Sequence, residues 1–151
     1  MELIPITESG VFDAPVRRKP RLAGQVITAT TKLYSSVGYK PPWICYFAVE
    51  NGDCVGTCGF KSPPQENRVE IAYFTFPKYE SQGVATRMAS ELIRAATAED
   101  PGVLITAQTL PAVNASTSVL KKLGFQLVGT AEDEEVGLVW DWRLLDPPKQ
   151  V

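Results

Sequence analysis

The chain has 151 residues, of which 44% are hydrophobic and 21% are charged, and its formal net charge is −2. This length and composition predict a single folded domain over residues 1–151 rather than a disordered tail. The negative net charge argues against a nucleic-acid partner, because non-specific binding to phosphates needs a basic surface.

No stretch approaches the ~20 apolar residues that a transmembrane helix requires. Residues 1–5 contain no basic segment and no long apolar run, so they do not have the pattern of a signal peptide, and we expect a cytoplasmic protein with no membrane partner. Histidine is absent. A Ser-His-Asp or Cys-His arrangement is therefore excluded, and any general base must be a carboxylate, a lysine, a tyrosine or water.

The chain contains three cysteines, Cys45, Cys54 and Cys58. An odd number argues against a disulfide framework, and three thiols without histidine fall short of the four ligands of a structural zinc site. Cys54 and Cys58 are four residues apart on a predicted strand and should share one face. We interpret the cysteines as small buried side chains and expect no metal.

In the first half of the chain, the sequence predicts one helix and four strands. A short edge strand over residues 3–6 is followed by a helix over 22–34, which Gly38 and the prolines after it end. Three further strands are predicted at residues 43–49, 55–61 and 68–76. The turn Asn51-Gly52 favours a tight hairpin between the first two, so this part is expected to be an antiparallel meander.

After residue 77 the spacing of apolar residues changes to that of a helix over about 84–96. A nearly continuous apolar run at 103–107 indicates a strand buried on both faces. Asn114 is a good N-cap for a second helix that Gly124 ends. Strands at 125–130 and 136–144 should then form a hairpin around an acidic turn, residues 132–135. The predicted fold is α/β, with a single-domain mixed, largely antiparallel sheet flanked by helices.

One junction between a strand and a helix suggests a binding function. Residues 76–86 contain a strand end, a short turn with Gly83, and the start of a helix. The first amides of a helix have no internal partner and lie at the positive end of its dipole, so they can bind a phosphate. By itself this pattern is also that of an ordinary connection between two elements.

Three segments of the sequence together resemble the GNAT superfamily of N-acetyltransferases. Residues 81–86, Ser-Gln-Gly-Val-Ala-Thr, are similar to the Gly-x-Gly-Tyr-Ala-Thr stretch of that family. Residues 114–125 resemble its signature Asn-Ala-Ser-x-x-Val-Leu-x-Lys-x-Gly-Phe, and residues 69–73 its Val-Glu-Ile-Gly-Tyr strand. The set is most similar to the branch typified by ribosomal-protein N-terminal acetyltransferases. It departs from the family pattern at Glu80, in place of glutamine or arginine, and at Ser81, in place of a frequent glycine.

The resemblance implies that acetyl-CoA is the co-substrate. The pantetheine arm should bond to the backbone of the fourth predicted strand, the pyrophosphate should contact the turn before the helix, and Asn114 should contact the arm near the acetyl group. Asn114 can also be a plain N-cap, and the two roles are compatible. The expected cofactor-binding residues are Phe74, Thr75, Ser81, Gln82, Gly83, Val84, Ala85, Thr86 and Asn114.

The resemblance also implies the catalytic residues. Glu70 matches a family glutamate on the strand beside the cofactor and is the expected general base, acting directly or through water. Its alternative role is to pair with Arg68 on the same face of the strand. Many family members have a tyrosine where this chain has Leu120, so Ser116 is the expected acid for the leaving thiolate. Transfer that depends mainly on orientation remains an alternative.

The expected reaction is transfer of an acetyl group from acetyl-CoA to a primary amine, either a small molecule or a protein N-terminus, in a ternary complex. The acidic turn could attract a cationic amine, although such runs of charge usually face water. The basic residues 17–19 could help hold a phosphate or form a solvated loop. A homodimer is left open. The alternative functions are a non-catalytic acyl-CoA-binding module and, less favoured because no phosphate-binding Gly-x-x-x-x-Gly-Lys loop is present, a nucleotide-binding protein.

Overall fold

The computed structural model describes residues 1–12, 16–17 and 19–145. Its helices and strands follow the predicted order along the chain. They are β1 (Glu2–Pro5), α1 (Ala23–Val37), β2 (Cys45–Glu50), β3 (Asp53–Phe60), β4 (Arg68–Thr75), the short 3-10 helix η1 (Pro77–Tyr79), α2 (Val84–Glu99), β5 (Leu104–Thr109), α3 (Ala115–Lys122), β6 (Gln126–Asp133) and β7 (Gly137–Leu144).

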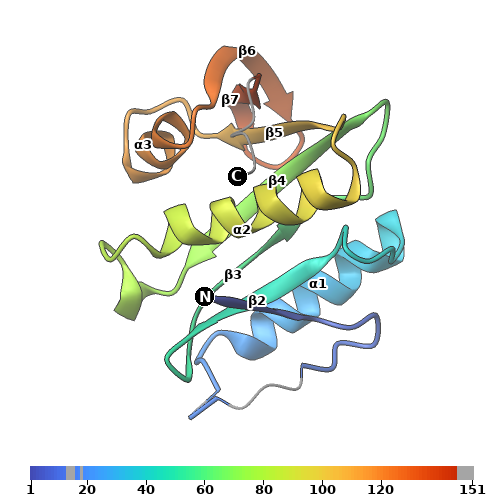
Figure 1. The fold of residues 1–151 in the computed structure, drawn as a ribbon, viewed down its shortest axis with the longest axis vertical. Helices are drawn as coiled ribbons and strands as arrows, with labels where there is room; N and C mark the ends of the chain where they lie inside the picture. Colours follow the sequence, from blue (N-terminus) through green and yellow to red (C-terminus); the bar gives the residue numbers. More distant parts are fainter. Residues whose placement is uncertain (13–15, 18, 146–151) are drawn as a thin grey trace.

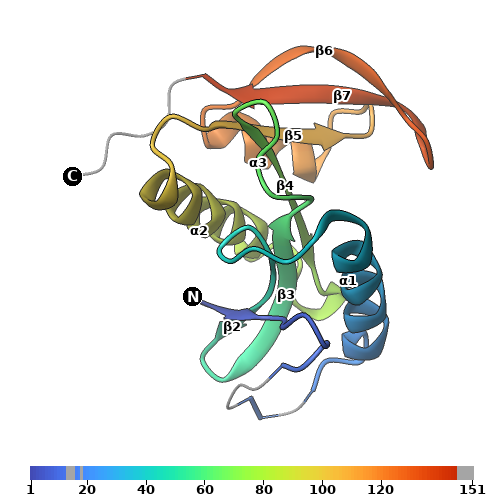
Figure 2. The same ribbon diagram turned by 90° about the vertical axis from the view of Figure 1, so that its right-hand side faces the viewer.

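The strands form one seven-stranded sheet in the order β1-β2-β3-β4-β5-β7-β6. Neighbouring strands run antiparallel except β4 and β5, which are parallel. Helix α2 covers one face of β3 and β4, and α1 lies on the opposite face (Figure 1 and Figure 2). The predicted mixed, largely antiparallel sheet flanked by helices is confirmed.

Strand β4 is central to the sheet and presents a different surface to each helix. Val69 and Ile71 are 2% exposed and pack in the same core as the buried face of α2. Glu70 and Ala72 point to the other face, because successive side chains alternate along a strand. The two faces of this strand therefore differ, and Glu70 lies on the side of α1.

Two local signals in the sequence correctly predicted how the chain turns. Asn51 and Gly52 have φ values of 51° and 79°, the left-handed conformation that a tight hairpin turn between β2 and β3 requires. Helix α1 ends at Gly38, whose φ is 91° and whose amide donates to the Tyr34 carbonyl. Both positions favour residues that tolerate a positive φ.

The glycines of β3 allow neighbouring backbone to approach closely. A Cβ atom on Gly56 would lie 2.6 Å from the Phe74 carbonyl oxygen, and one on Gly59 would lie 2.6 Å from the Cα of Cys45. The β2–β3 register also shifts next to Gly56, where Ala48 pairs with Gly56 and Val49 with Cys54. One extra residue in β3 is thus accommodated as a bulge.

This bulge makes one prediction wrong. Cys54 and Cys58 do not share a face: Cys54 packs in the cluster beneath α1, whereas Cys58 packs in the core beneath α2. The extra residue between them reverses the alternation of side chains. All three cysteines are free, and burial raises the pKa of the Cys45 thiol to about 11 and that of Cys54 to about 12. Their protonated state agrees with a packing role.

The last hairpin differs from the prediction in its turn. Strand β6 continues to Asp133, so the first two residues of the predicted acidic turn belong to a strand. The turn is tight because the Asp133 carboxylate accepts hydrogen bonds from the amides of Glu135 (2.8 Å) and Val136 (3.1 Å). These two bonds lower the pKa of Asp133. Local bonding of an aspartate to the backbone two and three residues on explains why the turn lies at residues 134–136.

Within the described ranges, none of the helices combines the length and apolar character needed to cross a membrane. In the same ranges, no group of three or more cysteine, aspartate or glutamate side chains is arranged to hold a metal ion.

Candidate functional site

The site begins where β4 and β5 separate. The two strands pair only from Arg68 to Ile71 on β4 and from Leu104 to Ala107 on β5. Beyond that point β4 continues beside β3, whereas the end of β5 pairs only with β7. The divergence of the two strands is visible in Figure 1. It leaves an opening inside the sheet, between its two halves.

A cleft of about 260 Å³ lies at this opening. Its walls come from the end of β3, the open part of β4, the end of β5 and the start of α3. They include two residues predicted from the sequence, Asn114 and Ser116. The lining residues are Lys61, Ile71, Ala72, Tyr73, Ala107, Gln108, Thr109, Leu110, Asn114 and Ser116.

The backbone of β4 has hydrogen-bonding groups free at this opening. The carbonyl of Glu70 accepts from the Lys61 amide (2.9 Å), and the amide of Phe76 donates to the Val55 carbonyl (3.0 Å). Because these directions alternate along an antiparallel strand, Phe74 also bonds toward β3, and Thr75 is directed to the open edge. Tyr73 and Thr75, rather than Phe74, thus offer backbone groups to a ligand in the opening.

The loop after β4 has a conformation that ordinary residues rarely adopt. Ser81 has a φ of 63° and Gly83 a φ of 76°. A left-handed serine is unfavourable by about 1–2 kcal/mol. The sequence departs from the family pattern at Ser81, and the structure shows that the position keeps the backbone conformation of a glycine.

Helix α2 starts at this loop without a neutralising group. No side chain caps its N-terminus, and its first turn contains no acidic residue. Arg87 is the first residue of the helix whose amide donates a helical hydrogen bond, to the Gly83 carbonyl (3.1 Å). The amides of residues 84–86 therefore have no helical acceptor and lie at the positive end of the helix dipole. This arrangement can bind a phosphate or pyrophosphate.

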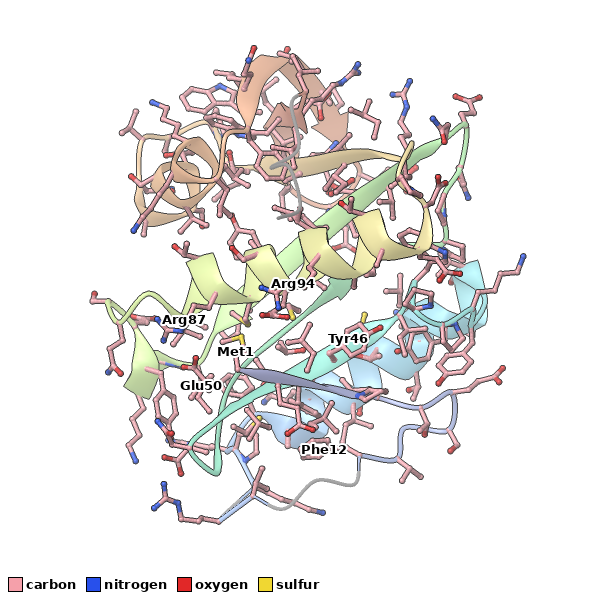
Figure 3. The ribbon with its side chains drawn as sticks, in the orientation of Figure 1. Met1, Phe12, Tyr46, Glu50, Arg87 and Arg94 are labelled. Carbon is pink, nitrogen blue, oxygen red and sulfur yellow. The ribbon has the colours of Figure 1, made fainter. Side chains whose placement is uncertain are left out.

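Arg87 holds the loop in place. Its guanidinium donates to both carboxylate oxygens of Glu50, at 2.7 and 2.9 Å, and to the Gln82 carbonyl at 2.9 Å. Figure 3 shows the Arg87 and Glu50 side chains together beside the start of α2. The hydrogen bonds from Arg87 lower the pKa of Glu50. Because Arg87 bonds to a carbonyl of the loop, it fixes the loop and leaves the first amides of α2 free.

Glu70 lies next to the cleft on the α1 face but does not line it. Its Oε2 atom is buried and lies 2.5 Å from Lys61 Nζ, yet no described residue donates a well-directed hydrogen bond to it. The distance shows a close ion pair between Glu70 and Lys61. The cross-strand partner of Glu70 is therefore Lys61, which does line the cleft, and not Arg68 as the sequence suggested. Lys61 follows directly after β3 and lies opposite Glu70. Only the strand register could have revealed this pairing.

Two more polar residues continue this row across the sheet. Glu70 pairs in register with Thr106 of β5, and Thr106 with Arg143 of β7. The Arg143 guanidinium is 3.7 Å from the Asp141 carboxylate, and its buried Nε atom has no acceptor among the described residues. The buried Arg143 Nε and the Glu70–Lys61 pair thus lie on one face, two strands apart.

Helix α3 presents Asn114 and Ser116 to the cleft through a capping box. Asn114 Oδ1 accepts from the Thr117 amide (3.2 Å), and Thr117 Oγ1 accepts from the Asn114 amide (2.9 Å). The predicted N-cap role of Asn114 is confirmed. Both Asn114 and Ser116 are exposed in the cleft wall. Leu120, which replaces the family tyrosine, is fully buried and cannot reach the cleft.

Tyr73 is a residue of the site that the sequence analysis did not identify. Its hydroxyl donates to the Ser116 carbonyl (3.3 Å) and so connects β4 to α3 beside the cleft. Burial raises the pKa of Tyr73 to about 12, which keeps the hydroxyl protonated near neutral pH. There was little indication of this role in the sequence, because Tyr73 continues the apolar face of β4 and has the pattern of a core residue.

Among the described residues, Arg17 and Lys19 form no hydrogen bond or ion pair with residues 81–86. The Arg17 guanidinium donates to the Asn51 carbonyl and forms an ion pair with Asp53 at 3.3 Å. It therefore supports the β2–β3 turn. Lys19 lines a separate pocket with Lys78 and Tyr79 of η1, and Arg18 lies outside the described residues.

Comparison with known proteins agrees with this geometry. A family model described as an acetyltransferase (GNAT) domain matches residues 13–126. No curated protein sequence matches the chain. Among solved structures, the chain is similar to the ribosomal-protein-S18-alanine N-acetyltransferase from Escherichia coli, with 13% identity, 76% and 75% of the two chains covered, and a TM-score of 0.59.

Two similar structures were solved with coenzyme A. The ribosomal L7/L12 alpha-N-protein acetyltransferase is 15% identical, with 83% of this chain and 72% of that chain covered and a TM-score of 0.64. An aminoglycoside acetyltransferase is 18% identical, with 66% and 64% covered and a TM-score of 0.57. At these identities the structures support the fold, and the match of the family model over most of the sequence supports the family. The chain therefore belongs to the GNAT family of acetyltransferases.

Proposed function

We propose that the protein is an N-acetyltransferase that moves the acetyl group of acetyl-CoA to a primary amine, either of a small molecule or of a protein N-terminus. The reaction is a direct attack in a ternary complex. The proposal takes residues 1–151 as one acyltransferase domain acting in the cytoplasm. It rests chiefly on the opening between β4 and β5, which leads to a helix N-terminus without a neutralising group.

Acetyl-CoA fits the residues around this opening. The pantetheine arm carries amides, and the backbone of Tyr73 and Thr75 can bond to them as a neighbouring strand would. The pyrophosphate is an anion of the kind that the loop and first turn of α2, residues 81–86, can bind. Asn114 and Ser116 line the cleft, so we expect them to lie near the thioester.

The chemistry requires two proton movements. The amine nitrogen attacks the thioester carbonyl carbon, a C–N bond forms, and the C–S bond breaks. The nitrogen loses a proton, and the departing thiolate gains one. We assign the first transfer to Glu70, directly or through water, because its carboxylate lies beside the cleft and contacts Lys61, which lines the cleft. We assign the second to Ser116 or to Tyr73, both of which line the cleft.

Isothermal titration tests the co-substrate directly. Acetyl-CoA and desulfo-coenzyme A should bind saturably with a stoichiometry of one, and ATP, which lacks the pantetheine arm, should not compete. A thiol-release assay with a panel of amines then tests transfer. A folded sample that binds neither acetyl-CoA nor another acyl-CoA would refute the proposal.

A non-catalytic acyl-CoA-binding module is the second candidate. Two observations favour it: Leu120 is buried where many family members have a tyrosine, and Glu70 is already paired with Lys61. Such a module would bind acetyl-CoA in the titration but release no thiol with any amine. Tight binding without turnover across the amine panel would support this alternative.

A further inference from the structure

An apolar pocket lies on the α1 face of the sheet, on the opposite side of β4 from α2. Its volume is about 250 Å³. Val26, Ala29 and Leu33 of α1 form one wall, and Phe74 of β4, which is 48% exposed, lies opposite them. Apolar side chains exposed together in a concave site favour an apolar ligand.

The pocket exists because two adjacent strands have small residues on this face. Gly59 of β3 pairs in register with Ala72 of β4, and both line the pocket. Gly59 cannot be replaced by a larger residue, because a Cβ atom there would lie 2.6 Å from the Cα of Cys45. The close packing of the β2 and β3 backbones thus requires glycine at this position, and the absence of a side chain there leaves space beneath α1.

This pocket and the cleft between β4 and β5 meet at one place. Lys61, Ala72 and Tyr73 line both. Glu70 lies on the same face as Ala72 and pairs with Lys61. A ligand whose apolar part fills the pocket would therefore present its other end beside Glu70, at the inner end of the cleft.

We propose that the amine accepted by this protein carries an uncharged apolar group, of the size of a branched aliphatic chain or a single ring, that binds in the pocket beneath α1. This inference rests on the proposed acetyl transfer and specifies its acceptor. The volume supports the size, because an apolar cavity of about 150 Å³ holds benzene and whole-ligand pockets begin at about 300 Å³. The charge at the rim of the pocket agrees with an uncharged group, because the Glu70 carboxylate is paired with Lys61 and is not a free partner for a second cation on the acceptor.

Matched amines test the proposal, with rates expressed per concentration of the neutral amine. Isopentylamine and phenethylamine should be acetylated with a kcat/KM at least about tenfold higher than ethanolamine and putrescine, since filling an apolar pocket discriminates by that much or more. The peptides Leu-Gly-Gly and Gly-Gly-Gly separate a peptide N-terminus from a small molecule as the source of the apolar group. Faster acetylation of putrescine or ethanolamine would overturn the inference and leave the transferase proposal standing.

A substitution tests whether this pocket is the site of discrimination. Ala29→Phe should fill the pocket and make phenethylamine a poorer substrate, with its kcat/KM lowered at least about tenfold and the acetyl-CoA affinity unchanged. Ala98→Phe makes the same change at an exposed position near the far end of α2 and should leave all amines unaffected. Thermal melts of both variants establish that they are folded.

Equal rates for wild type and Ala29→Phe would overturn the assignment of the pocket. If no amine or peptide releases thiol although acetyl-CoA binds, both this inference and acetyl transfer fail. If acetyl-CoA does not bind a folded sample, the proposed function fails at its first step. The outcomes therefore distinguish an error in the acceptor from an error in the reaction.

Discussion

The two sides of the site are built in different ways. On the α2 side, one contiguous stretch, residues 77–87, supplies the loop, the free amides and the arginine that fixes the loop. On the α1 side, the groups come from α1, β3, β4, β5 and β7, and strand register brings them together. Binding on the first side depends on backbone conformation, and selection on the second depends on side chains. Substitutions on the α2 side should therefore change the affinity for acetyl-CoA, and substitutions on the α1 side should change the turnover rate and the choice of acceptor.

The largest effect is expected from Glu70→Gln on the α1 side. Removing a general base lowers kcat by at least about 100-fold near neutral pH, while the affinity for acetyl-CoA stays within about twofold because the α2 loop is untouched. Arg68→Gln, two residues away on the same face and exposed, is the matched control and should be near wild type. An unchanged kcat in Glu70→Gln would remove Glu70 from the mechanism and weaken the contrast between the two sides.

On the α2 side, Gly83→Val should weaken acetyl-CoA binding about 10- to 100-fold. The position has a φ of 76°, and a Cβ atom would lie 2.8 Å from Arg87 Nη1, so both the loop and its arginine must shift. Titration calorimetry measures the loss. Gly38→Val introduces the same strain at the end of α1, where a Cβ atom meets nothing within 4 Å, and should destabilise the fold without altering affinity. Unaltered binding in Gly83→Val would refute the placement of the pyrophosphate.

Tyr73 lies between the two sides, and Tyr73→Phe separates its possible roles. If its hydroxyl protonates the leaving thiolate, kcat should fall about tenfold with the acetyl-CoA affinity unchanged. Tyr39→Phe removes a hydroxyl away from the cleft and should have no effect. A Tyr73→Phe variant with normal kcat would leave Ser116 as the proton donor, and Ser116→Ala would then be the informative variant.

The Arg87–Glu50 pair should make loop stability depend on pH. Hydrogen bonds from Arg87 lower the pKa of Glu50 below its ordinary value of 4.5. The contribution is thus fully present above about pH 4.5 and is lost as the pH falls through the lower pKa of the folded state. Relative to Glu50→Gln, the wild type should be more stable by about 1 kcal/mol at pH 7, a value reduced for solvent exposure.

Urea unfolding of wild type and Glu50→Gln at several pH values measures this difference. It should shrink toward zero near pH 3, and Glu99→Gln, at an exposed position at the end of α2, should show no such trend. A difference that persists at pH 3 would show that the pair contributes through packing rather than charge.

The smallest effect is expected at Ser81. Replacing a left-handed serine by glycine removes about 1 kcal/mol of strain, so Ser81→Gly should raise the melting temperature by about 2–4 °C. Ser36→Gly, in the exposed part of α1, should lower it instead, because glycine weakens a helix. A lower melting temperature for Ser81→Gly would mean that the serine hydroxyl contributes more than the strain costs.

The same contrast explains what the sequence could predict. The Asn51-Gly52 turn, the Asn114 cap and the loop at Gly83 are local features, and each involves a few consecutive residues. The order of elements and the family resemblance follow from such features. The α2 side of the site was therefore accessible from the sequence, although the roles of its residues remain predictions.

The α1 side was less accessible because it depends on register. The Lys61–Glu70 pair joins residues that lie apart in the sequence, and the sequence suggested only Arg68 as a partner of Glu70. One bulge put Cys54 and Cys58 on opposite faces, because inserting a single residue inverts the alternation of a strand. The apolar pocket requires that Gly59 of β3 lie opposite Ala72 of β4. No pattern within a single strand can reveal such a pairing.

The separation of β4 from β5 also has a consequence for self-association. It exposes an unpaired strand edge in the interior of a sheet, and such an edge is a template for the backbone of another chain. A ligand that bonds along Tyr73 and Thr75 would fill this edge, so its binding would protect the protein from aggregation as well as prepare it for chemistry. If acetyl-CoA binds there as proposed, the resistance of the protein to aggregation would depend on the concentration of that co-substrate.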